Sequence, residues 1–152
     1  MSIKSIESQE RNMRRLAELL GHDLSYIGGE RESGPNGEKK VFLNLGKTFL
    51  RTLAKDLGLH DVKVTSNPGG IAVSGECSLY GMWENGGICV CISQPCLSGM
   101  DTVLYRSIRH VRDYKGGHNQ FVSRSELATM SYDQFLNRLL TVRKDAVYER
   151  AA

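Results

Sequence analysis

The 152-residue sequence contains no apolar run that approaches the roughly 18 residues needed to span a membrane. Residues 1–10 also lack the apolar core of a secretory signal. These absences predict a cytoplasmic protein without membrane contact. Net charge is low as well, because 20 Lys and Arg face 17 Asp and Glu, which gives +3. So small an excess does not by itself indicate a nucleic-acid partner.

Motifs of the common enzyme and cofactor classes are also missing. Gly46-Lys47-Thr48 matches the end of a phosphate-binding loop, but that motif needs a glycine where the chain has Val41. The glycine pairs at 28–29 and 69–70 lack a dinucleotide fingerprint. No His-Glu-x-x-His, Gly-x-Ser-x-Gly or paired-carboxylate motif occurs. The sequence therefore predicts no bound cofactor.

The cysteines are few and lie close together in the chain: Cys77, Cys89, Cys91 and Cys96. In the cytoplasm such residues are thiols, metal ligands or buried apolar groups rather than disulfides. Cys89 and Cys91 share one face of a strand, whereas the expected strand pairing puts Cys77 on the other face. A four-ligand zinc site would then need Cys96 and a histidine, His110 or His118. We therefore predict no metal site and keep zinc as an alternative.

Apolar periodicity divides the N-terminal half into local elements. The spacing predicts a helix over residues 5–20 that ends at Gly21, and a charged, glycine-rich surface loop over 28–38. A short strand is expected over 40–45, followed by a helix over 47–57. Alternation over 61–65 predicts a further strand.

A β-hairpin is the best-defined element. Its arms cover 71–83 and 88–94, and Asn85-Gly86 forms a two-residue turn that places Trp83 opposite Ile88. The predicted core face consists of Ile71, Val73, Cys77, Leu79, Trp83, Ile88, Val90 and Ile92. The opposite face carries Glu76, Tyr80, Met82, Cys89 and Cys91.

The C-terminal half continues with a strand over 102–111 and two helix starts. Ser123 with Glu126, and Ser131 with Gln134, fit the capping box. The last helix should bury an apolar stripe: Phe135, Leu136, Leu139 and Leu140. The whole chain, 1–152, is thus predicted to be one α+β domain. Its antiparallel sheet is centred on the hairpin turn at Asn85-Gly86 and covered by helices on one face.

One segment, residues 104–124, combines positive charge with planar rings. Its candidate binding residues are Tyr105, Arg106, Arg109, His110, Arg112, Tyr114, Lys115, Gly116, Gly117, His118 and Asn119. Cationic side chains would neutralise phosphates, and Tyr105 and Tyr114 would stack on bases. The glycine turn would let the backbone approach, and its consecutive amides can hold an anion.

Two other interpretations of this segment stay open. It can be a solvated edge strand whose charges prevent sheet aggregation. On a strand, Arg106, His110 and Arg112 would in either case share one face with Ile108. It can also be catalytic, with His110 or His118 as base oriented by Asp113. The nucleophile would then be Cys96 or Ser107.

The string Tyr105-Arg106 followed by Arg112-Asp-Tyr-Lys-Gly-Gly-His-Asn119, downstream of Ser74-Gly-Glu76, resembles short accessory proteins of phages, plasmids and mobile elements. The resemblance covers residues 70–121 and implies an accessory role without a defined activity. Our leading hypothesis is a non-enzymatic protein that binds nucleic acid, a nucleotide or another anionic ligand. The alternative is a protein-interaction module that inhibits a host enzyme or defence complex, since Arg and Tyr are enriched in such interfaces.

Overall fold

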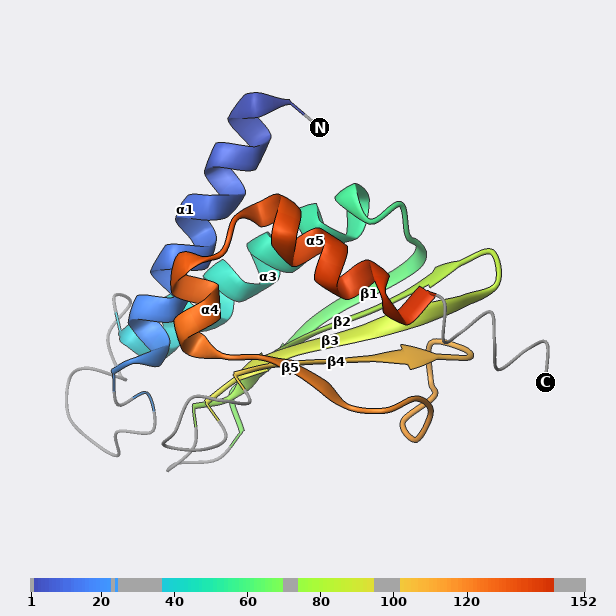
Figure 1. Cartoon of the computed structure of the whole chain (residues 1–152). Coiled ribbons are helices and arrows are strands. Elements are labelled where there is room, and N and C mark those ends of the chain that lie inside the picture. Colours follow the sequence, from blue (N-terminus) through green and yellow to red (C-terminus); the bar gives the residue numbers. More distant parts are fainter. Residues whose placement is uncertain (1, 23, 25–36, 70–73, 95–101, 144–152) are drawn as a thin grey trace.

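The computed structural model describes residues 2–22, 24, 37–69, 74–94 and 102–143. In chain order its elements are α1 (Ile3–Leu20), α3 (Glu38–Asp56), β1 (His60–Asn67), β2 (Glu76–Trp83), β3 (Gly86–Ser93), β4 (Val103–Ile108), β5 (Gln120–Val122), α4 (Arg124–Thr129) and α5 (Tyr132–Leu140). The strands form one antiparallel sheet in the order β1-β2-β3-β4-β5. These helices all lie on one side of it (Figure 1). The predicted α+β class is confirmed.

The face of the sheet beneath the helices is the core. The predicted core positions of the hairpin are confirmed as buried for Cys77, Leu79, Trp83, Ile88, Val90 and Ile92. β4 and β5 add Val103, Tyr105 and Val122 to the same layer. Ile71 and Val73, which were expected there, lie outside the described residues.

The hairpin turn differs from the prediction by two residues of register. Trp83 pairs with Gly86 and Leu79 with Val90, so the turn is formed by Glu84 and Asn85. A type I′ turn at Asn85-Gly86 would need positive φ at both positions. Gly86 has a positive φ of 136°, but Asn85 does not. Among the described non-glycine residues, only Asp61 has a positive φ. A shift of two residues keeps every side chain on its predicted face.

The expected strand over 40–45 is wrong, because these residues form the first turns of α3. Val41, Leu43 and Leu45 alternate as in a strand and are only partly buried against the core, whereas Phe42 and Phe49 are fully buried in it. Their spacing of seven is helical, and Gly46 lies inside the helix rather than at a break. The start at residue 38 also shortens the predicted 28–38 loop, of which only 37 and 38 are described.

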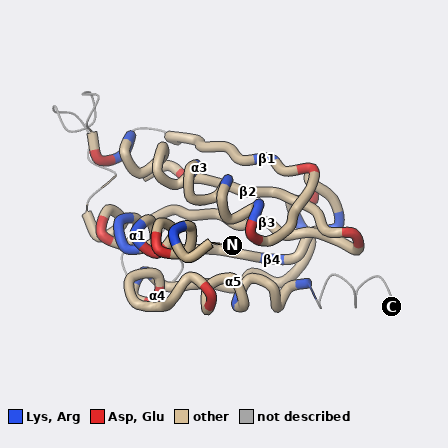
Figure 2. The backbone as a smooth tube through the Cα atoms, turned by 90° about the horizontal axis from the view of Figure 1, so that it is seen from above, with Lys and Arg blue, Asp and Glu red and all other residues tan. Residues whose placement is uncertain are grey.

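Capping boxes begin two of the helices, and a chain of buried hydrogen bonds connects α1, α3 and α5. Both predicted capping boxes are confirmed at Ser123 and Ser131. Gln9 Nε2 of α1 donates to the Phe49 carbonyl and to the Tyr132 hydroxyl, each at 3.2 Å. That hydroxyl donates to Asp56 Oδ2 at 2.6 Å. The helical side carries both signs of charge along α1 (Figure 2).

No helix in the described ranges combines the length and the apolarity that crossing a bilayer requires.

Candidate binding surface on the open face of the sheet

The sheet face opposite the helices is called the open face. Its side chains follow from the alternation along the paired strands: Ser78, Tyr80, Met82, Cys89, Cys91, Leu104, Arg106, Ile108 and Phe121. The connection between β4 and β5, here called loop 109–119, extends on this side of the sheet (Figure 1). The predicted segment 104–124 therefore reaches the open face.

The predicted strand over 102–111 ends earlier, at Ile108. The chain turns there because the amide of Arg109 donates to Asp113 Oδ2 and the amide of Asp113 donates to the His110 carbonyl. Arg109, His110 and Arg112 consequently lie on the loop, and the predicted sharing of a strand face by Arg106, His110 and Arg112 is wrong.

Arg106 holds loop 109–119 against the sheet. Its Nη1 donates to the Gly116 carbonyl and its Nη2 to the Asp113 carbonyl, both at 2.8 Å. The residue is only 7% exposed. A guanidinium that lies under the loop and bonds to two backbone carbonyls has a structural role, which leaves a phosphate little access to it.

Asp113 organises the same loop from within. Its carboxylate accepts hydrogen bonds from Arg109 Nε at 3.0 Å, from the Gly116 amide at 2.8 Å and from the Lys115 amide at 3.2 Å. These contacts, the Arg109 side chain first, hold the pKa of Asp113 well below its usual range although burial opposes them. The amides proposed to receive an anion thus already bind one, the Asp113 carboxylate.

Both glycines of the loop serve this packing. A Cβ atom on Gly116 would lie 2.1 Å from Asp113 Oδ2, and one on Gly117 would lie 2.5 Å from the Ser107 carbonyl oxygen. Gly117 also has φ of +73°, which disfavours a side chain. The two glycines were predicted to let the backbone approach a ligand. In the structure they let the backbone approach Asp113 and Ser107 of β4.

The remaining predicted residues divide by exposure. Tyr105 is buried in the core beneath the helices, where a base has no access to its ring. The exposed ones all lie on loop 109–119: Arg109, His110, Arg112, Tyr114, Lys115, His118 and Asn119. The structure brings these seven together on a loop whose shape is fixed by Arg106 and Asp113.

The residues of the catalytic alternative do not form a constellation in the described ranges. The Asp113 carboxylate is bonded to Arg109 and to loop amides. Ser107 is 2% exposed, and its Oγ has no hydrogen-bond partner among the described atoms. Cys96 lies outside the described residues.

Two aromatic residues beside the loop were not among the predicted site residues. Tyr80 of β2 meets Tyr114 edge to face, with ring centroids 6.1 Å apart. Phe121 of β5 is 41% exposed on the same face, and Tyr114 is 68% exposed. The sequence signal for Tyr80 is the alternation of β2, which puts this residue on the face opposite the core. Phe121 lay in the predicted segment but depended on the unpredicted strand β5.

The open face also carries two thiols on β3. Cys89 Sγ lies 3.9 Å from Cys91 Sγ, and Ser78 Oγ lies 3.2 Å from Cys91 Sγ. The hydrogen bond from Cys89, aided by Ser78, lowers the pKa of Cys91 to about 7. Cys77 is on the helical side, as predicted, and burial raises its pKa to about 12.

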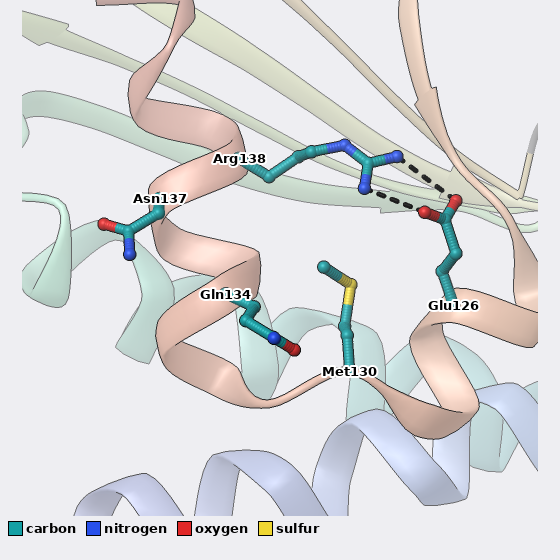
Figure 3. Close-up of a pocket in the computed structure, with 5 residues that line it drawn as sticks. All are labelled: Glu126, Met130, Gln134, Asn137 and Arg138. Carbon is teal, nitrogen blue, oxygen red and sulfur yellow. Dashed lines mark hydrogen bonds and ion pairs between the residues drawn. The ribbon is translucent and has the colours of Figure 1, made fainter.

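A separate groove of about 520 Å³ lies between α4 and α5 (Figure 3). Its charged groups pair with each other, because Arg138 donates to both carboxylate oxygens of Glu126 at 2.8 and 3.2 Å. Gln134 Oε1 accepts from the Ser131 amide in the capping box. The groove's principal polar groups therefore serve the helices themselves.

Comparison with known proteins adds no assignment to this geometry. No family model, curated protein or solved structure matches the chain. The resemblance to mobile-element accessory proteins stays a prediction.

Proposed function

We propose that the open face and loop 109–119 bind single-stranded nucleic acid without catalysing a reaction. The observation that carries this proposal is the position of Tyr114, a 68% exposed ring set against Tyr80 on an open sheet face. A protein that needed Tyr114 only for packing would bury more of it. Exposed planar rings on a sheet are a platform on which unpaired bases stack.

The aromatic positions span several strands of the sheet. Tyr80 is on β2 and Phe121 on β5, so three strand spacings of about 4.8 Å separate their backbones by roughly 14 Å. Tyr114 stands beside Tyr80 and extends the platform from the loop. This arrangement suits several unstacked bases of a single strand better than a duplex, whose base faces are covered.

Exposed cations flank the rings. Arg112 and Lys115 lie two positions before and one after Tyr114, and both are exposed. Lys63 of β1 is exposed and pairs directly with Tyr80. Arg109 is less suited to a phosphate contact because its Nε is bonded to Asp113 at 3.0 Å. Arg112, Lys115 and Lys63 are therefore the cations we assign to the phosphate backbone.

The test is the binding of labelled single- and double-stranded DNA and RNA oligonucleotides at low and at moderate salt. We expect single strands to bind more tightly and with a steep salt dependence. Tyr114→Ala should weaken binding roughly 5- to 150-fold, the range for loss of one stacked base. Arg112→Ala/Lys115→Ala should reduce the slope of log affinity against log salt by about 1.4, the value for two contacts to a single strand.

The matched control is Arg51→Ala/Lys55→Ala, which removes the same charge from exposed positions of α3 on the helical side. It should leave affinity and salt slope nearly unchanged. Equal losses in both double variants would indicate nonspecific attraction and contradict the proposed site. Absence of binding at low salt would overturn the function and leave the protein-interaction alternative.

A further inference from the structure

Two thiols of β3 form a compact pair that the proposed nucleic-acid surface does not use. Cys89 and Cys91 project from the open face, and their sulfur atoms are 3.9 Å apart. Cys89 is 1% exposed, whereas Cys91 is half-buried, so a small solute can reach the pair through Cys91. Tyr80 of β2 and Arg106 of β4 flank Cys89, and Ser78 of β2 and Leu104 of β4 flank Cys91.

Strand geometry disfavours a disulfide between these residues. Positions i and i+2 of a strand lie about 6.7 Å apart at Cα, with side chains nearly parallel. A disulfide needs Cβ atoms about 3.8 Å apart, which the extended backbone of β3 does not allow without distortion. The sulfurs can approach by side-chain rotation, but they remain two thiols.

A single metal ion can bridge the same pair without moving the strand. Two metal–sulfur bonds of about 2.3 Å span any sulfur separation up to roughly 4.6 Å. Two-coordinate Cu(I) prefers a linear S–Cu–S arrangement, so the sulfur atoms, 3.9 Å apart in the free chain, would separate by about 0.7 Å on binding through side-chain rotation. Thiolate ligands select soft ions, among them Cu(I) and zinc.

The number of ligands decides between Cu(I) and zinc. Structural zinc takes four protein ligands. In the described residues no group of three or more His, Cys, Asp or Glu side chains is placed to hold a metal. Cu(I), a d¹⁰ ion of low charge, is satisfied by two thiolates, so the pair matches its coordination.

We propose that Cys89 and Cys91 bind one Cu(I) ion as a two-coordinate dithiolate on the open face. Two S–H bonds are replaced by two S–Cu bonds, and both protons pass to solvent. Copper stays in the +1 state and no other group is oxidised or reduced. Ser78 Oγ lies 3.2 Å from Cys91 Sγ and can donate a hydrogen bond to the thiolate, and Arg106 is the strand partner of Cys89 on β4.

The test is an anaerobic titration of the reduced, full-length chain with Cu(I) against a chromogenic Cu(I) chelator. Every variant carries Cys96→Ser, because that cysteine lies outside the described residues. We expect one Cu(I) per chain with sulfur-only coordination by X-ray absorption. Cys89→Ser and Cys91→Ser should each weaken Cu(I) binding more than about 100-fold. That loss is larger than the one caused by removing a residue that only hydrogen-bonds to a metal ligand. Cys77→Ser, on the opposite face, should bind as the parent does.

A second measurement needs no substitution at the pair. Mass-spectrometric mapping of iodoacetamide modification should show that one equivalent of Cu(I) protects Cys91 in the parent chain. Cu(I) affinity in the Cys89→Ser and Cys91→Ser variants equal to that of the parent, or no protection of Cys91, would overturn the proposal. The outcome is independent of nucleic-acid binding, since the titration contains no oligonucleotide.

Discussion

Arg106 and Asp113 are joined by a hydrogen bond from a buried guanidinium to a backbone carbonyl, Nη2 to O, at 2.8 Å. A second bond of the same length links Arg106 to the Gly116 carbonyl. The most buried arginine of the basic segment therefore positions the loop, on which Arg112 and Lys115 are exposed. Structural and binding roles within one segment can then be separated by substitution.

Replacement of Arg106 by lysine tests the structural role at constant charge. A lysine cannot reproduce the fork that reaches two carbonyls, so one buried acceptor loses its partner. We expect Arg106→Lys to lower the free energy of unfolding by about 1.5–3 kcal/mol and to accelerate amide exchange in loop 109–119. Urea unfolding and hydrogen exchange measure the two effects. The control Arg112→Lys, at an exposed position, should change stability by less than about 0.5 kcal/mol. Unchanged stability in Arg106→Lys would contradict the structural role.

Asp113 should make stability depend on pH in the acid range. Its pKa is lowered in the folded chain, so its contribution is complete above the unfolded value of about 3.9 and is lost as pH falls toward the folded value. Asp113→Asn should cost about 2 kcal/mol at neutral pH and progressively less below about pH 4.

Urea titrations of both proteins from pH 7 downward measure this difference. Glu126, whose pKa is lowered to about 2 by Arg138, titrates in the same window but in both proteins alike. The difference between them therefore isolates Asp113. A gap that stays constant down to pH 2.5 would show that the carboxylate charge is not what stabilises the loop.

Features that depend on residues close in sequence were predictable. The capping boxes at Ser123 and Ser131 involve side chains three positions apart, and both form. The two faces of the hairpin follow from alternation alone, so the residues of each face were predicted correctly although the turn was not. Local pattern was therefore sufficient for the fold class and for most of the core.

Features that depend on tertiary contacts were not predictable. The alternation of Val41, Leu43 and Leu45 is compatible with a strand, and only the burial of Phe42 and Phe49 in the core decides for a helix. In the site, the partners of Arg106 are backbone carbonyls, which carry no sequence signal. An arginine that binds phosphate and one that supports a loop look the same in the sequence.

Trp83 links the end of α3 to the sheet. Its buried indole Nε1 donates to the Leu57 carbonyl at 2.7 Å, where the helix has ended and its last carbonyls need partners. Trp83→Phe keeps an aromatic ring but loses the donor and part of the volume. We expect a loss of about 2–4 kcal/mol in urea unfolding followed by circular dichroism. A loss below about 0.5 kcal/mol would mean that water replaces the indole at Leu57.

At Gly46, α3 lies close to β2. A Cβ atom there would lie 2.4 Å from Cys77 Sγ and 3.0 Å from Cys77 Cβ. Elsewhere in a helix, alanine in place of glycine stabilises by about 1 kcal/mol. At this position overpacking should outweigh that gain, and we expect Gly46→Ala to destabilise by about 1–3 kcal/mol. Asn44→Ala, an exposed change in the same helix, should instead be neutral or slightly stabilising.

A double-mutant cycle locates the cause of that loss. Cys77→Ala removes the sulfur atom that the new methyl group would meet, so Gly46→Ala should cost at least about 1 kcal/mol less in the Cys77→Ala background. The coupling follows because both side chains compete for one volume between helix and sheet. Additive losses would place the penalty in the helix backbone and contradict the close packing of α3 on β2.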